Sequence, residues 1–302
     1  MTDLSVSPLT TDTAPPQSER KQARAENWRL IRRRPSFIIG SLMVLFWIVC
    51  AALGERITPH DANNFFAKTK AGAVGVHIKP SWDYPFGTDR LGRDVLSRVM
   101  MGSRDILKVA PLAAVLSVIA GVILGITMGY FRGWLDIVLG RLVEAFLAIP
   151  VILLGFVAVA TLGQSSWVVI FVVAVLFTPV VARTVRSAVL AERDLDYVTS
   201  AKLRGENSLF IMFREILPNV SAPIIVELTI RIGYAVFSVA TLSFIGAGPR
   251  PPSPDWGAQV SDNYRLLQAH VWWSTLFPAL AIASLVIAIN LIADAVQSVL
   301  EA

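Results

Sequence analysis

The chain has 302 residues, a formal net charge of +5 and a mean hydropathy of +0.60. Hydrophobic residues make up 54% of it and charged residues 16%, whereas soluble domains carry about 25% charged residues. This composition excludes a disordered or coiled-coil chain and favours a membrane-spanning protein. The single cysteine, Cys50, excludes an internal disulfide framework, and the three histidines form no spaced metal motif.

The N-terminal region divides into a polar tail and a first apolar run. Residues 1–27 are rich in Ser, Thr, Pro, Gln and charge, which is typical of disorder. With the basic stretch that follows, residues 1–35 are interpreted as a cytoplasmic tail. The charge-free run over 36–53 is longer than the 7–15-residue core of a signal peptide, so it predicts an uncleaved first transmembrane helix.

Five more apolar runs lie in residues 109–302, which we interpret as the core. A hydrocarbon layer of about 30 Å takes roughly 20 residues of helix, so each run has the length of one span. The prediction is an all-α polytopic membrane protein with six transmembrane helices. The five further spans are Val109–Phe131, Leu142–Leu162, Ser165–Ala182, Ala222–Gly248 and Val271–Ala293.

The distribution of Lys and Arg predicts the topology. Basic residues precede the first span, so the N-terminus is expected in the cytoplasm, and six spans return the C-terminus there. The segment 183–221 is then a basic cytoplasmic loop, and 54–108 is extracytoplasmic. Within the latter, apolar residues at helical spacing predict an amphipathic helix over 91–106 that lies along the membrane surface.

The prolines and tryptophans in or near the predicted spans are interpreted as structural residues. Each proline removes one backbone hydrogen bond and can kink its helix, as expected at Pro150, Pro179 and Pro278. Tryptophans at the headgroup level are usual in membrane proteins. No special function is assigned to the three near the outer end of the last span, Trp256, Trp272 and Trp273.

Several catalytic motifs are absent from the sequence. The dipeptide Gly-Lys of a phosphate-binding loop does not occur, nor do H-E-x-x-H and G-x-S-x-G. We therefore predict no catalytic, cofactor-binding or metal-binding residues in this chain. Because the basic charge is explained by membrane orientation, no nucleic-acid partner is expected. Transport or a structural membrane role is favoured.

The loop from Tyr197 to Asn219 is the most informative stretch. It is predicted to form two short helices broken at Gly205, because glycine adopts positive φ readily. Asn207 or Ser208 is placed to cap the second helix, and Pro218 to end it. The alternative is an ordinary connection between two spans.

This loop resembles a family motif. The spacing Ala201-x-x-x-Gly205, followed twelve residues later by Leu217-Pro218, is similar to the "EAA" loop of binding-protein-dependent ABC transporter permeases. Thr199 and Ser200 depart from the usual Glu and Ala, and Glu215 stands where a hydrophobic residue or His is usual. In that family the loop docks into a cleft on the ATPase subunit. The resemblance implies that this coupling role falls to Ala201, Lys202, Leu203, Arg204, Gly205, Glu206, Asn207, Ser208, Leu217 and Pro218.

Further stretches narrow the resemblance to dipeptide, oligopeptide and nickel permeases, in the second of their two permease subunits. They are Pro85–Arg98 with Gly102–Arg104, Leu242–Gly248 followed by 251–257, and Asn290–Asp294. Val239 departs from a frequent Glu. The resemblance implies a type I ABC importer permease fold in a bacterial inner membrane. It also implies a second permease subunit, an extracytoplasmic solute-binding protein, and separate or fused ATPase chains that bind ATP and Mg.

Two sets of polar residues are further candidates. The outer set could form a gate or contact a partner, and comprises Gly87, Thr88, Asp89, Gly92, Arg93 and Asp94. For Thr88 and Asp89 we favour a structural turn in which one of them caps the following helix. The second set could line a polar path or pair helices. Pairing is favoured there, because the charges lie near predicted helix ends: Arg141 with Glu144, and Glu227 with Arg231.

The sequence therefore predicts a permease subunit of an ATP-driven importer for di- or oligopeptides. Relatives also handle nickel chelates and glutathione, so another small solute is an open alternative. A gradient-driven secondary transporter and a membrane scaffold without transport are two further alternatives.

Overall fold

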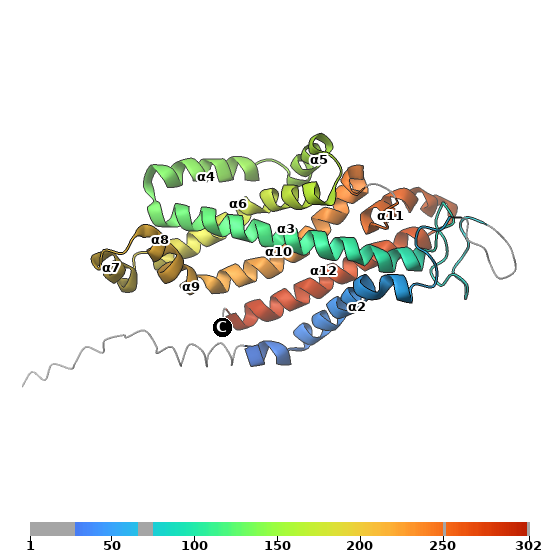
Figure 1. The fold of residues 1–302 in the computed structure, drawn as a ribbon, viewed down its shortest axis with the longest axis horizontal. Helices are drawn as coiled ribbons and strands as arrows, with labels where there is room; N and C mark the ends of the chain where they lie inside the picture. The colour runs from blue at the N-terminus through green and yellow to red at the C-terminus, as the bar shows by residue number, and fades with distance from the viewer. Residues whose placement is uncertain (1–27, 66–74, 250–251, 301–302) are drawn as a thin grey trace, which may run out of the picture.

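The computed structural model describes residues 28–65, 75–249 and 252–300, so the predicted disordered tail over 1–27 lies outside the described residues. Five long helices run side by side along the longest axis (Figure 1). Each is long and apolar enough to cross a membrane. They are α2 (Pro35–Ile57), α3 (Val95–Phe131), α6 (Ser166–Glu192), α10 (Ser221–Leu242) and α12 (Trp273–Leu300).

The predicted span Leu142–Leu162 is bent rather than straight. Two helices occupy this region, α4 (Gly133–Leu147) and α5 (Val151–Leu162), and their axes differ by 88°. Pro150 lies at the break in a non-helical conformation, with φ of −56° and ψ of 117°, and its ring and missing N–H disfavour continuation of α4. Counted as one broken span, the pair brings the total to the expected six.

The amphipathic surface helix predicted over 91–106 is wrong. Residues from Val95 onward form the first turns of α3, which continues unbroken for 37 residues. At 1.5 Å per residue this helix is about 55 Å long, well beyond the hydrocarbon thickness. Its first turns are buried among segments of the same chain rather than against lipid, because Val99, Ser103 and Ile106 are all inaccessible.

Short helices close the two ends of the bundle. α6 continues to Glu192, so the connection to α10 is shorter than the predicted loop over 183–221. α10 ends in a π-helical turn, η2 (Ser243–Ala247). One end is formed by α7 (Asp196–Leu203), α8 (Ser208–Phe210), η1 (Ile211–Ile216) and α9 (Leu217–Asn219) (Figure 1). The other end is formed by residues 75–94, α11 (Trp256–Asn263) and η3 (Tyr264–Ala269).

Glycines let α3 and α6 pack closely. Gly121, Gly125 and Gly129 recur every fourth residue and so lie on one face of α3. A Cβ built on Gly125 would lie 2.6 Å from the carbonyl oxygen of Ala182. Small residues at such spacing allow backbones in membranes to approach and gain dispersion contacts. The valines that fill this seam from α6 are Val181, Val185 and Val189.

Large apolar side chains remain exposed along several of the helices. They include Leu42 and Phe46 of α2, and Ile137 and Leu153 of α4 and α5. Such surfaces would drive aggregation in water, but they suit a hydrocarbon environment or another transmembrane subunit.

The α3–α6 seam yields a matched pair of variants. Gly125→Ala is expected to lower the free energy of unfolding by about 1–3 kcal/mol, because the added methyl overpacks the seam. Gly140→Ala, in α4, should be neutral or stabilising, since its Cβ would meet only the Met128 Cε at 3.9 Å. Thermal unfolding in mild detergent measures both. Equal melting temperatures for the two variants would contradict the tight seam.

Candidate functional site

The break between the two loop helices is a helix C-cap built on Gly205. Its φ is +78°, its N–H donates to the Lys202 carbonyl at 3.0 Å, and the next N–H, of Glu206, donates to the Ala201 carbonyl at 3.2 Å. This pair of bonds is the Schellman arrangement, which requires a left-handed residue after the helix. The predicted break at Gly205 is therefore confirmed.

The following turn begins as the sequence predicts and ends slightly later. Asn207 caps α8, because its side-chain oxygen accepts from the N–H of Phe210 at 2.7 Å. Pro218 does not itself end the helical stretch, which passes through η1 and α9 to Asn219. We refer to residues 196–219 as the knob. It is compact because backbone hydrogen bonds at Gly205 cap the end of α7 and the side chain of Asn207 caps the start of α8.

The knob is attached rigidly to the bundle. Val198 and Ala201 of α7 are fully buried and belong to one apolar cluster with Ile211 and Ile216. The same cluster contains Val185 and other residues of α6, and it reaches α3 through Ile126. A force applied to the knob would thus be transmitted to both helices rather than absorbed in a flexible linker.

The tip of the knob exposes apolar side chains. Leu203 is 84% exposed and Leu209 is 65% exposed, on either side of Gly205. Phe213 is also exposed. A Cβ at Gly205 would meet no atom within 4 Å, so space around the glycine is open. Leu209 and Phe213 are not among the predicted coupling residues. Both lie in the apolar run 209–213, and nothing in that run distinguishes them from the buried Ile211 and Met212.

Glu215 has an internal partner. The Arg204 Nη2 donates to its carboxylate at 3.2 Å and so joins the end of α7 to η1. Arg204 also lies 3.8 Å from the carboxylate of Glu206. At the base of the knob, the Tyr197 hydroxyl donates to Glu192 at 2.7 Å. Burial, followed by the adjacent Glu192 carboxylate, raises the pKa of Tyr197 to about 12, so this donor stays protonated.

The opposite end of the bundle holds a buried polar cluster, which we call the outer cluster: Thr88, Asp89, Arg93, Asp94, Ser97 and Arg98. All six residues are at most 3% exposed. One Asp89 oxygen accepts from the N–H groups of Leu91 and Arg93, and the other accepts from the Arg93 Nε at 2.7 Å. This geometry supports the structural turn favoured for Asp89.

The cap of α3 is a different residue from the ones expected. Asp94 accepts from the N–H of Ser97, and His60 lies 3.5 Å from the same carboxylate. The expectation that Thr88 or Asp89 caps the helix is therefore wrong. Thr88 instead accepts from the N–H of Ile78 at 2.8 Å.

Arg98 joins three segments of the outer end. It donates to the carbonyls of Ala62 and Ser253, at 3.1 and 3.2 Å, from its position on α3. Two tryptophans add long-range bonds. Trp256 donates to the Val99 carbonyl at 2.7 Å, and Trp273 donates to the Thr88 carbonyl at 3.0 Å. Both indoles are buried, so Trp256 fastens α11 to the start of α3 and Trp273 fastens α12 to the turn that precedes α3.

The glycines of the outer set permit this packing. Gly87 and Gly92 have φ of +69° and +72°. A Cβ on Gly87 would also lie 2.6 Å from the Trp273 Nε1. Because the outer cluster is filled from within the chain, any direct contact with another protein falls to exposed neighbours such as Arg90.

The two charge pairs of the spans differ in their surroundings. The Arg231 Nε donates to Glu227 at 2.9 Å, both side chains are 12% exposed, and Thr184 of α6 donates to the other Glu227 oxygen at 2.8 Å. This pair therefore ties α10 to α6, as the helix-pairing interpretation expects. Arg141 and Glu144 also pair, at 3.1 Å, but lie mostly exposed on α4.

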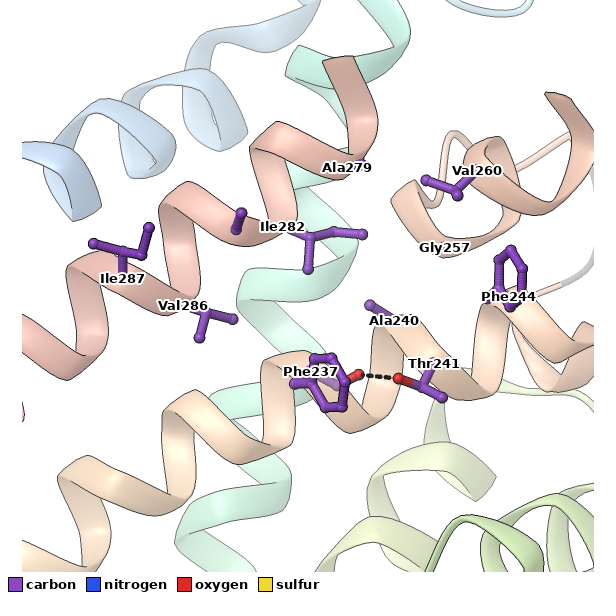
Figure 2. Close-up of a pocket in the computed structure, with 11 residues that line it drawn as sticks. Phe237, Ala240, Thr241, Phe244, Gly257, Val260, Ala279, Ile282, Val286 and Ile287 are labelled. Carbon is purple, nitrogen blue, oxygen red and sulfur yellow. Dashed lines mark hydrogen bonds between the residues drawn. The ribbon is translucent and has the colours of Figure 1, made fainter. Parts of the chain in front are cut away.

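An apolar groove of about 480 Å³ lies between α10, α11 and α12. Figure 2 shows Phe237, Phe244 and Ile282 along its walls. The hydroxyl of Thr241 is satisfied by the carbonyl of Phe237 at 2.8 Å. The groove therefore offers no free polar group to a zwitterionic solute.

Asp255 is a buried carboxyl at the outer end, outside the spans. It caps α11 by accepting from the N–H of Ala258 at 2.9 Å. Burial raises its pKa to about 6, despite the hydrogen bonds that oppose the shift. Because the folded state then holds a proton more tightly than the unfolded chain, this group contributes stability at low pH that is lost as the pH rises through about 6.

Known proteins are similar to this chain over most of its length. The family described as "Binding-protein-dependent transport system inner membrane component" matches residues 121–302. The chain is 37% identical over 278 residues to the glutathione transport system permease protein GsiD of Escherichia coli O6:K15:H31, covering 91% of this chain and 89% of that protein. GsiD of Pectobacterium atrosepticum is 34% identical over 278 residues, with coverage of 91% and 90%.

The raised pKa of Asp255 is tested by Asp255→Asn, which keeps a capping side chain but cannot ionise. Wild type should gain stability relative to the variant as pH falls from about 7 to about 5, and the variant should be at least as stable near pH 8. Melting temperatures in detergent across this range provide the measurement. Parallel pH profiles for the two proteins would contradict the assignment.

Proposed function

Because the chain belongs to the family of binding-protein-dependent transport system inner membrane components, we propose that it forms half of the translocation path of an ATP-driven importer for short peptides. The chain is a multi-pass permease subunit of an ABC importer of the dipeptide/oligopeptide family and not an enzyme. This identity excludes the secondary-transporter and scaffold alternatives. The type I importer permease fold implied by the resemblance is likewise confirmed.

The observation that supports coupling is the knob at Gly205. It combines an exposed apolar tip, Leu203 and Leu209, with a base packed rigidly on α6. A tip of this kind fits a cleft on a partner ATPase. The proposed coupling residues lie on or beside it: Ala201, Lys202, Leu203, Arg204, Gly205, Glu206, Asn207, Ser208, Leu217 and Pro218.

The proposed mechanism is a rigid-body shift. ATP and Mg bind in partner ATPase chains, fused or separate, and closure of the ATPase pair displaces the knob. The shift passes along α6 and α3, because their glycine seam leaves little room for independent movement. The bundle, paired with a second permease subunit, then opens outward and receives solute from an extracytoplasmic binding protein.

The proposed orientation follows the charge distribution. The knob and both termini lie in the cytoplasm, where Lys and Arg are favoured, and the outer cluster faces the binding protein. In this scheme Gly87, Thr88, Asp89, Gly92, Arg93 and Asp94 hold the outer ends of the helices in place. Arg90 beside them is partly exposed and paired with Asp262, and this pair is placed to contact the binding protein. The pair Glu227–Arg231 holds α10 on α6.

Glutathione is the first candidate among short peptides. It is the solute named in the two GsiD relatives, and it is a tripeptide with charged termini. The apolar groove of Figure 2 has no free polar group to recognise such a solute. We therefore assign peptide recognition to the interface with the second subunit and to the binding protein.

The coupling proposal is tested at Gly205 with two variants of similar size. Gly205→Asn should retain most uptake, because Asn tolerates positive φ and the space is open. Gly205→Asp places a carboxylate in the ATPase contact and should abolish uptake while the complex still assembles and hydrolyses ATP. Uptake assays and ATPase assays on the same membranes separate the two effects. Normal uptake by Gly205→Asp would refute the assignment of the knob.

The substrate proposal is tested by competition. Uptake of labelled glutathione by cells that express the whole importer should fall when unlabelled di- or tripeptides are added. A nickel chelate at equal concentration should leave it unchanged. Inhibition by the chelate alone, or absence of any peptide uptake, would favour a nickel chelate as the substrate instead of a peptide.

A further inference from the structure

A second pocket, this one with a polar lining, lies between α3, α4 and α6, near the end of the bundle that carries the knob. Its volume is about 300 Å³, the lower end of the range for small-molecule sites. Asp136, in the first turn of α4, and Met128, near the end of α3, line it. Arg193, which caps the end of α6, donates to the Tyr130 carbonyl at 2.6 Å and closes the bundle just beyond.

Charges in this pocket leave one arginine without a partner. Arg186 is paired with Asp136 through two bonds, of 2.6 and 2.7 Å. Arg141 is paired with Glu144 at 3.1 Å. Arg183 lines the same pocket and makes no hydrogen bond or ion pair with any residue that the structure describes. The lining therefore carries a net charge of +1, concentrated on the guanidinium of Arg183.

Beside the exposed Arg141–Glu144 pair, α4 also presents outward-facing apolar side chains next to the pocket. On α4, Ile137 lines the pocket and is exposed, and Val138 and Leu142 extend the apolar surface along the same helix. Trp134, one turn away, is also exposed. A ligand held here would thus have a charged group inside and apolar surface beside it.

We propose that this pocket binds the phosphate of an anionic phospholipid, with Arg183 as the principal donor and the acyl chains along α4. One negative charge on a phosphodiester matches the net charge of the lining, and a guanidinium suits phosphate oxygens. Basic pockets between transmembrane helices on the cytoplasmic side are favourable sites for such headgroups. The inference rests on the proposed function only for the cytoplasmic placement of this end.

The bound lipid would contact α4 and α6, and α6 is the helix that connects to the knob. α4 contributes Asp136 to its ion pair with Arg186 of α6, and α6 leads directly into the knob. A headgroup between α4 and α6 would fix their separation at the level of the glycine seam. Its loss would leave Arg183 unpaired beside hydrocarbon, which is unfavourable.

The test measures lipid bound to the assembled, detergent-purified complex by native mass spectrometry. Phosphatidylglycerol should bind, and phosphatidylcholine, which has no net charge, should bind much more weakly. Arg183→Gln should weaken phosphatidylglycerol binding about tenfold, the effect of losing one charge-assisted hydrogen bond. Gly140→Leu should also weaken it, because its side chain would enter the open space of the pocket without changing any charge.

Controls separate this site from other sources of binding. Arg33→Gln removes an exposed charge outside the pocket and should leave the lipid bound. Equal binding of both lipids, or unchanged binding in both pocket variants, would overturn the proposal. So would displacement of the lipid by inorganic phosphate or by a substrate peptide, since the pocket would then belong to a soluble ligand. The Gly205→Asp complex should keep its lipid. Lipid binding therefore tests the pocket separately from the uptake assay, which tests the coupling proposal.

Discussion

The close packing of α3 on α6 is the constraint on which the rest of the structure depends. Three glycines at four-residue spacing remove the side chains that would otherwise separate these helices, and valines of α6 fill the space. Because lipid offers no hydrophobic force to hold helices together, such contact is a principal source of their association. α3 is also the longest helix, so its position determines where both ends of the molecule lie.

The two ends of α3 meet two different kinds of structure. At its start, Arg98 joins it by hydrogen bonds to segments more than thirty and more than one hundred residues away. Near its other end, Ile126 packs in the apolar cluster that holds the knob. A polar, directional junction on one side and an apolar one on the other make α3 a rigid connection between the proposed binding-protein side and the proposed ATPase side.

Much of this fold could be predicted from local sequence. Charge-free runs located the spans, and Gly205 with Asn207 located the break in the knob, because each depends on only a few neighbouring residues. The effect of a proline could not be read in the same way. α6 and α12 continue through the buried Pro179 and Pro278, whereas the exposed Pro150 lies at the break between α4 and α5.

Long-range partners explain the remaining differences. The helix start over 95–106 has the pattern of a surface helix, but Trp256 and Gln259, far along the chain, cover it with hydrogen bonds to Val99 and Arg98. Asp89 and Asp94 are equally good caps by sequence, and only the path of the chain decides between them. Likewise, nothing in the sequence near Trp273 indicates that its indole bonds to the carbonyl of Thr88.

The most direct measurement is photo-crosslinking from position 203, at the exposed tip of the knob, in native membranes with mass spectrometry of the products. The account predicts a crosslink to a chain that carries a Gly-x-x-x-x-Gly-Lys-Ser/Thr nucleotide-binding loop, with a second permease subunit in the same purified complex. Crosslinks only to lipid or to further copies of this chain would contradict it.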